Sequence, residues 1–183
     1  MADKKSFWNE AGLAGLCLGA VPIVYFGTGM LIGLISPEKT GLVLIGSAVS
    51  LLLWVAKLLL CIYLMRSFMQ RFSSSNPEAD NSHVFRFGCA VAFLSALIYS
   101  AFYLAYVGFI APDTFSTAME AITSNPMMDS NSLSAVEEMM PKMPRIAFFA
   151  NLIYCTLYGT VLSAILSRNI PPENPFLNKN GNE

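Results

Sequence analysis

One charged side chain in this sequence stands where charge is costly. Lys57 lies inside the apolar run LLLWVAKLLLCIYLMR, residues 51–66, which is typical of a bilayer-spanning helix. A charge in that position costs about 2.5–3.5 kcal/mol on insertion scales. A lysine ammonium carries three N–H donors and no acceptor, so it can bind an anion. Lys57 is therefore the candidate contact for an anion or for a partner subunit.

The same chain holds no obvious counter-ion for Lys57. All 12 acidic residues fall outside the apolar runs. Neutral candidates are tyrosine hydroxyls, Ser and Thr groups, Asn151 and the backbone carbonyls near Pro22, where a proline should kink the helix. Side chains lean toward the N-terminus of their helix, so Lys57 should point away from the nearer water. Two interpretations stay open: snorkelling or a neutral bundle site, and recognition of a lipid phosphate or a partner's carboxylate.

Residues with the spacing of a catalytic centre are missing from the sequence. There is no GxSxG, HExxH, Walker or GxGxxG pattern. Met140 and Met143 carry thioethers that suit Cu(I), but the segment around them has no His or Cys to complete a site. The four cysteines lack CxxC spacing and read as small buried hydrophobes: Cys17, Cys61, Cys89 and Cys155. We expect no enzyme activity, no cofactor and no metal.

Composition sets the class of protein. The chain has 183 residues, of which 55% are hydrophobic and 13% charged, against about 25% charged in soluble domains. This leaves too little charge to coat a water-facing surface, and it predicts a membrane protein. The net charge of −1 provides no basic field for nucleic acid, so that class of partner is excluded.

Four apolar runs are long enough to cross a bilayer, which takes about 20 helical residues. They predict an all-α membrane protein of one domain, residues 1–183, with four transmembrane helices arranged as two hairpins. Short amphipathic helices are expected in the outer segment 111–145, one after Pro112 and one from Ser134. The expected spans, linker and tail are 11–35, 41–65, 88–110 and 146–166, a flexible linker at 72–82 and a flexible cytoplasmic tail at 167–183.

The distribution of Lys and Arg predicts the orientation. Seven of these residues fall on the side of the two termini, and three fall on the other side. Because cytoplasmic loops carry the excess of positive charge, both termini should be cytoplasmic and the segment 111–145 should face outward.

Small residues spaced four apart mark helix-packing faces. Helices in a membrane associate through close packing at such residues, either within the bundle or in a homo-oligomer or a complex with another inner-membrane protein. The candidate packing residues are Gly15, Gly19, Gly29 and Gly33 in the first span, Gly88, Ala92 and Ala96 in the third, and Asn151, Gly159 and Ser163 in the fourth.

The order of several motifs resembles a known family. SFWNEAGLAGLCLG comes first, then HVFRFG, YSAFYLAYVGFIAPD, EEMMPKMPR and a tail with NPF. Over about residues 5–177 this resembles domain of unknown function 4199, a family of four-helix membrane proteins found mainly in Bacteroidota. The resemblance implies residence in the bacterial inner membrane, no established activity and no assigned catalytic residues. The chain departs from the family at SSSNPEADNS, where members usually carry a Lys-rich stretch.

Two functions follow as hypotheses. The first is a non-enzymatic accessory or scaffold subunit of a membrane complex. The alternative is a lipid- or anion-binding transport element that uses Lys57, with the bilayer, an anionic lipid or another membrane protein as partner. Members of the resembled family are often encoded beside a polyprenyl-phosphate glycosyltransferase, so the resemblance implies envelope glycolipid metabolism as a setting for this alternative.

Overall fold

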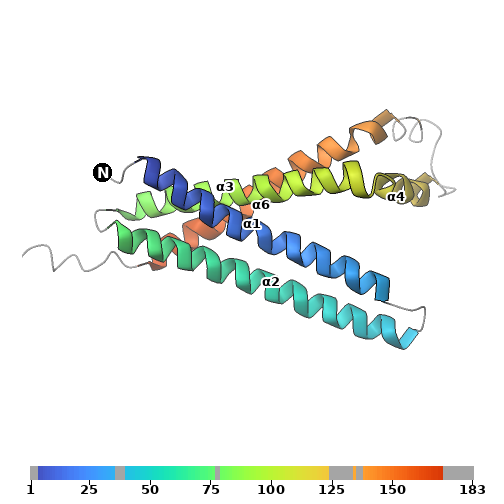
Figure 1. The fold of residues 1–183 in the computed structure, drawn as a ribbon, viewed down its shortest axis with the longest axis horizontal. Coiled ribbons are helices and arrows are strands. Elements are labelled where there is room, and N and C mark those ends of the chain that lie inside the picture. The colour runs from blue at the N-terminus through green and yellow to red at the C-terminus, as the bar shows by residue number, and fades with distance from the viewer. Residues whose placement is uncertain (1–3, 36–39, 77–78, 124–133, 135–137, 171–183) are drawn as a thin grey trace, which may run out of the picture.

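The computed structural model describes residues 4–35, 40–76, 79–123, 134 and 138–170. These residues form helices joined by turns, which confirms the predicted all-α class (Figure 1). Four helices are long and apolar enough to cross a membrane. The elements are α1 (Lys4–Ile35), α2 (Thr40–Ser75), α3 (Asn81–Ala105), a π-helical turn η1 (Tyr106–Ile110), α4 (Thr114–Thr123), a 3-10 turn η2 (Met140–Lys142) and α6 (Met143–Asn169).

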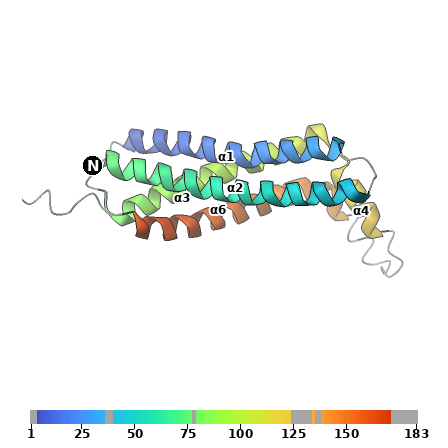
Figure 2. The same ribbon diagram turned by 90° about the horizontal axis from the view of Figure 1, so that it is seen from below.

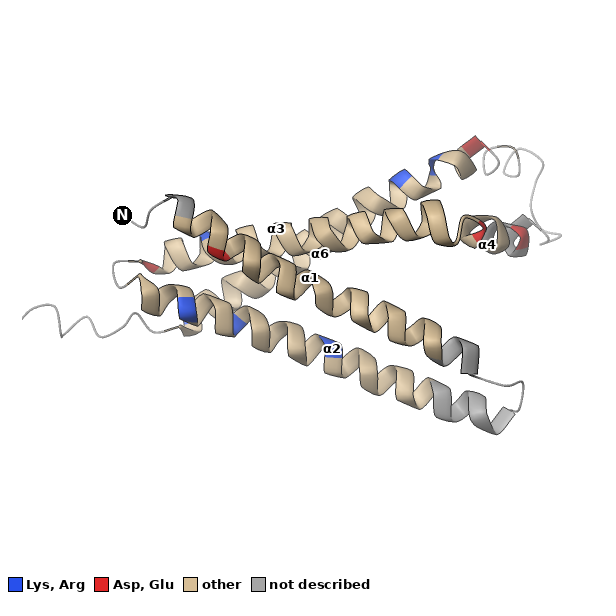
Figure 3. Ribbon diagram, in the orientation of Figure 1, with Lys and Arg blue, Asp and Glu red and all other residues tan. Residues whose placement is uncertain are grey.

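The four long helices run along one axis in alternating directions, as expected for two hairpins (Figure 2). Charged residues gather mainly toward the two ends of the bundle (Figure 3). At one end α1 begins, α2 ends, α3 begins and α6 ends. We call it the Arg-rich end after Arg66, Arg71, Arg86 and Arg168. The other end carries α4 and η2, and we call it the Met-rich end.

The segment predicted to be a flexible linker at 72–82 is largely helical. α2 continues to Ser75 and α3 begins at Asn81, so five residues separate the two helices. Asp80 caps α3, with its carboxylate accepting from the amide of Asn81 at 2.7 Å, and the Asn76 side chain donates to the carbonyl of Phe72 at 3.0 Å. Asp and Asn suggest a loop in a sequence, yet here they close helix ends.

The other span boundaries also differ from the expected ones. The candidate membrane spans are Ser6–Leu31, Ser47–Ser75, Asn81–Ile110 and Met140–Asn169. α6 therefore continues three residues into the segment 167–183 that was expected to be a tail. The remainder of that segment, 171–183, lies outside the described residues.

The best-packed core lies at the Arg-rich end. Phe72 of α2 stacks on Phe87 of α3 with ring centroids 4.2 Å apart, and Phe7 of α1 meets both rings edge-on at 5.7 Å. Met65 and Met69 are fully buried beside them. Because this core joins α1, α2 and α3, it closes the bundle at the Arg-rich end.

Toward the Met-rich end the two helix pairs diverge, with α1 and α2 on one side and α3 and α6 on the other (Figure 1). Phe26 of α1 spans the widening gap. Its ring lies 4.8 Å from that of Tyr106, 6.0 Å from Phe102 and 6.3 Å from Tyr103. Aromatic rings thus join α1 and α3 both at the Arg-rich end, through Phe7 and Phe87, and here.

Short helices at the Met-rich end match the expected amphipathic segment in part. α4 covers Thr114–Thr123, and the Thr114 hydroxyl donates to the carbonyl of Ala111 at 2.7 Å. Ser134, Glu138 and Met139 are helical, while most of the helix expected from Ser134 lies outside the described residues. Lys142 pairs with Glu138 at 3.2 Å.

Candidate functional site

The helices around Lys57 are positioned by close contacts at small residues, beginning with α1 against α3. A Cβ atom added to Gly15 would lie 2.7 Å from Cβ of Leu94, and one added to Gly19 would lie 3.0 Å from the carbonyl oxygen of Ser95. Neither position has room for a larger side chain. The two glycines therefore let α1 cross α3 at backbone distance.

The same device joins α3 to α6. A Cβ added to Gly88 would overlap the Ser163 hydroxyl and approach Sδ of Met69 to 3.2 Å, and one added to Gly159 would lie 3.3 Å from Cα of Ala92. The buried Ser163 hydroxyl donates to the carbonyl of Phe85 at 3.1 Å. The structure thus brings four predicted packing residues together between two helices of the same chain.

The remaining predicted packing residues differ in their burial and in their contacts. Ala96 is buried. Asn151 is half-buried and makes no hydrogen bond with a described residue. Gly29 was expected in a packing face, but nothing lies within 4 Å of its Cβ position, because Gly29 lines an open space between α1 and α2. The surroundings of Gly33 lie outside what the structure describes.

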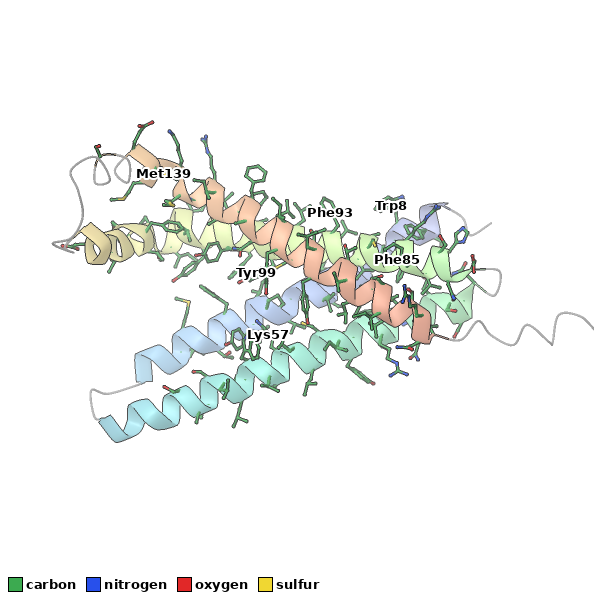
Figure 4. The ribbon with its side chains drawn as sticks, turned by 180° about the vertical axis from the view of Figure 1, so that it is seen from behind. Trp8, Lys57, Phe85, Phe93, Tyr99 and Met139 are labelled. Carbon is green, nitrogen blue, oxygen red and sulfur yellow. The ribbon has the colours of Figure 1, made fainter. Side chains whose placement is uncertain are left out.

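Lys57 borders a cavity between the two helix pairs. It lies near the middle of α2, where the pairs begin to diverge, with Tyr99 of α3 nearby (Figure 4). The cavity encloses about 180 Å³ and receives residues from all four long helices, including Pro22 of α1 and Tyr158 of α6. An engineered apolar cavity of roughly 150 Å³ is enough to bind benzene in another protein. The space beside Lys57 therefore suits a small group.

The ammonium group of Lys57 sits over an aromatic face. Its Nζ lies 4.6 Å from the ring centroid of Tyr25, so the contact is with the π-face and not with the hydroxyl that the sequence suggested. Counting from the contact of Phe7 with Phe72, Lys57 stands opposite Pro22. Tyr25 is three residues farther along α1, about 4.5 Å toward the Met-rich end. The side chain thus leans in the predicted direction.

No carboxylate approaches Lys57 among the described residues. The nearest acid along α1 is Glu10, 15 residues before Tyr25 and so about 22 Å away along the helix. Glu10 accepts a hydrogen bond from Ser6. Tyr99, Tyr154 and Tyr158 line the cavity, and their hydroxyls make no hydrogen bond with a described residue. The residues that line the cavity therefore include one cation and three tyrosines whose hydroxyls have no described partner.

A second cavity adjoins the first on the side of the Met-rich end. It encloses about 300 Å³ between α1 and α2, and its lining includes Tyr25, Met30 and Ser50. Tyr25 borders this space while Lys57 borders the other one. The Lys57–Tyr25 contact therefore lies at the boundary between the two cavities.

Sequence reasoning found Lys57 and offered tyrosine hydroxyls as its neutral partners, but it missed Trp54 and the contact with the ring face of Tyr25. Trp54, Lys57 and Cys61 lie on one face of α2, and Tyr154 with Tyr158 on one face of α6. Their spacing of three or four residues is the signal that could have grouped them. A second signal is their depth, since Trp and Tyr usually gather at the membrane–water interfaces and not at mid-span.

Comparison with known proteins gives one family. Residues 13–168 match the family model described as "Protein of unknown function (DUF4199)". Neither a curated protein nor a solved structure shows significant similarity to the chain.

Proposed function

The chain belongs to the DUF4199 family, whose members have no known function, and we propose that it is a non-enzymatic membrane protein that binds an anionic group beside Lys57. The observation that carries this proposal is the chemistry of the cavity lining. One lysine and three tyrosines line the same small space, and no described carboxylate lies near it. The ammonium can only donate and each phenol can donate, so such a lining suits a phosphate or a carboxylate.

Electrostatics supports the same proposal. The interaction of Lys57 with the ring of Tyr25 is worth about 0.5–2 kcal/mol, which is less than the cost of placing an ammonium in hydrocarbon, about 2.5–3.5 kcal/mol. The aromatic contact alone does not compensate the charge. A bound anion would make up the difference, because a charge-assisted hydrogen bond in a low dielectric is among the stronger polar interactions.

We also propose the bacterial inner membrane as the location, with both termini in the cytoplasm. Support comes from the four candidate spans and from the excess of Lys and Arg on the side of the Arg-rich end, which the positive-inside rule assigns to the cytoplasm.

Native mass spectrometry of the full chain, released from nanodiscs, tests the binding proposal. Wild type should retain an anionic species that Lys57→Met loses. The matched control is Arg66→Met, which removes a cation from an exposed position on the same helix and should leave the bound species in place. Equal retention in wild type and Lys57→Met, or equal absence from both, would overturn the proposal.

The accessory-subunit hypothesis predicts a protein partner. Its sequence argument came partly from the small-residue stripes, and Gly15, Gly19, Gly88 and Gly159 make contacts within the chain. These residues are therefore not free to contact a second protein. Co-purification of a stoichiometric protein partner that survives Lys57→Met would favour a subunit role over anion binding.

A further inference from the structure

The cavity beside Lys57 is open on one side, which we call its mouth. Among its lining residues, three side chains are exposed by more than a third: Trp54 at 45%, Tyr154 at 71% and Tyr158 at 42%. The residues on the opposite wall, Ala92 and Ala96 of α3, are each only 1% exposed. The cavity therefore opens between α2 and α6 and ends against α3.

The mouth lies between two helices that pack little on each other. α3 packs extensively on α6 and on α1, whereas α2 makes little contact with α6. Only 6% of the α2 span is buried, against 33% of the α3 span. α2 and α6 are consequently the pair that can leave a lateral opening, and that opening is at mid-height of the helices, in the region that lipid surrounds.

Packing restricts a route from the water at the Arg-rich end. Met65, Met69 and Phe87 are almost completely buried there. An anion from that side would therefore have to pass through packed side chains or through hydrocarbon, where an unpaired charge is strongly disfavoured. Toward the Met-rich end, the contact of Lys57 with Tyr25 separates this cavity from the second one.

From these observations we infer that the group bound beside Lys57 is the anionic headgroup of a membrane amphiphile, which enters sideways between α2 and α6 and leaves its apolar tail in the bilayer. This inference rests on the proposed anion-binding function and names the class of its ligand. The volume of about 180 Å³ accommodates a small headgroup and not a whole lipid. The exposed rings of Trp54 and Tyr158 would flank the tail where it leaves the cavity.

Trp54 also provides the probe for a test. The chain has two tryptophans, so Trp8→Phe leaves Trp54 as the single fluorophore at the mouth. The full chain is placed in phosphatidylcholine nanodiscs doped with phosphatidic acid brominated on its acyl chain, or with equally brominated phosphatidylcholine. Quenching by the anionic lipid should exceed that by the neutral lipid about fivefold in apparent affinity, the equivalent of about 1 kcal/mol for one cation.

Two variants distinguish lipid binding in the cavity from lipid binding at the protein surface. The preference should disappear in Lys57→Met and should persist in Arg66→Met, because Lys57 lines the cavity and Arg66 does not. A brominated fatty acid replaces the phosphatidic acid in a parallel series, which tells a carboxylate from a phosphate as the preferred headgroup. A preference that survives Lys57→Met would show binding at the protein surface and would overturn the inference.

The lateral route has its own test. Cys61 of α2 and Cys155 of α6 border the cavity from either side of the mouth, and Cys17→Ala with Cys89→Ala leaves these two thiols alone. Linking them with a short cleavable bis-maleimide before the lipid is added should abolish the preference, and cleavage should restore it. A preference unchanged by the link would overturn access between α2 and α6.

The two proposals can fail separately. Inorganic phosphate is added to the same nanodiscs without brominated lipid, and Trp54 emission is followed in wild type and Lys57→Met. A response to phosphate that depends on Lys57, without any lipid preference, would retain anion binding and overturn the amphiphile. A lack of response to every anion would overturn both.

Discussion

Gly88 of α3 faces Ser163 of α6 so closely that a methyl group added to the glycine would overlap the serine hydroxyl. The same hydroxyl donates to the carbonyl of Phe85, one turn earlier in α3, at 3.1 Å. One glycine and one serine thus set the distance between two transmembrane helices and also join them by a hydrogen bond. The Lys57 cavity ends against α3, and α6 forms one side of its mouth, so this contact helps to set the geometry of the candidate site.

Replacing Gly88 with alanine should destabilise the bundle. The new Cβ would lie 2.9 Å from Cβ of Ser163 and 3.2 Å from Sδ of Met69, and overpacking of this kind costs about 1–3 kcal/mol. Thermal unfolding in mild detergent measures the loss. Gly12→Ala is the matched control, because nothing lies within 4 Å of its Cβ position, and it should be neutral or stabilising by up to about 1 kcal/mol. Equal stability of the two variants would contradict the contact.

Ser163→Ala should cost less and should interact with the Gly88 change. It removes one interhelical hydrogen bond, worth about 0.6 kcal/mol on average in a membrane protein. In the double variant the alanine at 88 no longer meets a hydroxyl, so the combined loss should be smaller than the sum of the single losses. A double-mutant cycle of unfolding free energies measures this coupling, and strict additivity would place the two residues apart.

Tyr25→Leu should weaken the contact with Lys57, while Tyr25→Phe should preserve it. The ammonium lies 4.6 Å from the ring centroid, so the aromatic face is needed and the hydroxyl is not. A double-mutant cycle of Tyr25→Leu with Lys57→Met should give a coupling of about 0.5–2 kcal/mol. A coupling that is lost equally in Tyr25→Phe would mean that the hydroxyl binds the ammonium.

Phe26→Ala should let the two helix pairs separate further at the Met-rich end. The ring of Phe26 contacts those of Tyr106 and Phe102, and such pairs contribute about 0.5–1.5 kcal/mol each. Spin labels at the exposed positions Met30 and Phe109, introduced through Met30→Cys and Phe109→Cys in a cysteine-free chain, report the separation. Pulsed EPR should give a longer or broader distance distribution in Phe26→Ala, and an unchanged one would show that Phe26 does not hold the pairs together.

Orientation in the membrane is tested with two single cysteines in a cysteine-free chain. Ser75→Cys lies at the Arg-rich end and Lys142→Cys at the Met-rich end, both at exposed positions. An impermeant maleimide should label position 142 in intact spheroplasts, and position 75 only after permeabilisation, because the positive-inside rule puts the Arg-rich end in the cytoplasm. The reverse pattern would invert the proposed orientation.

Sequence patterns predicted some helix-packing residues correctly and others not. Gly15, Gly19, Gly88 and Gly159 make close contacts, while Gly29 belongs to the same kind of stripe and contacts nothing. Spacing places small residues on one helix face, but it does not say how far along its length a helix stays beside its neighbour. That distance depends on how the helices cross, and Gly29 lines an open space between α1 and α2.

By itself the sequence determined the membrane class, the four spans and the isolation of Lys57, because hydrocarbon admits only long apolar helices and tolerates few charges. These properties are local and can be read one segment at a time. The tertiary structure alone decided that the aromatic face of Tyr25 meets the ammonium, that Phe72 stacks on Phe87 where α2 and α3 extend into an expected linker, and that the cavity opens between α2 and α6. Each of these depends on residues far apart in the chain whose proximity comes from helix packing.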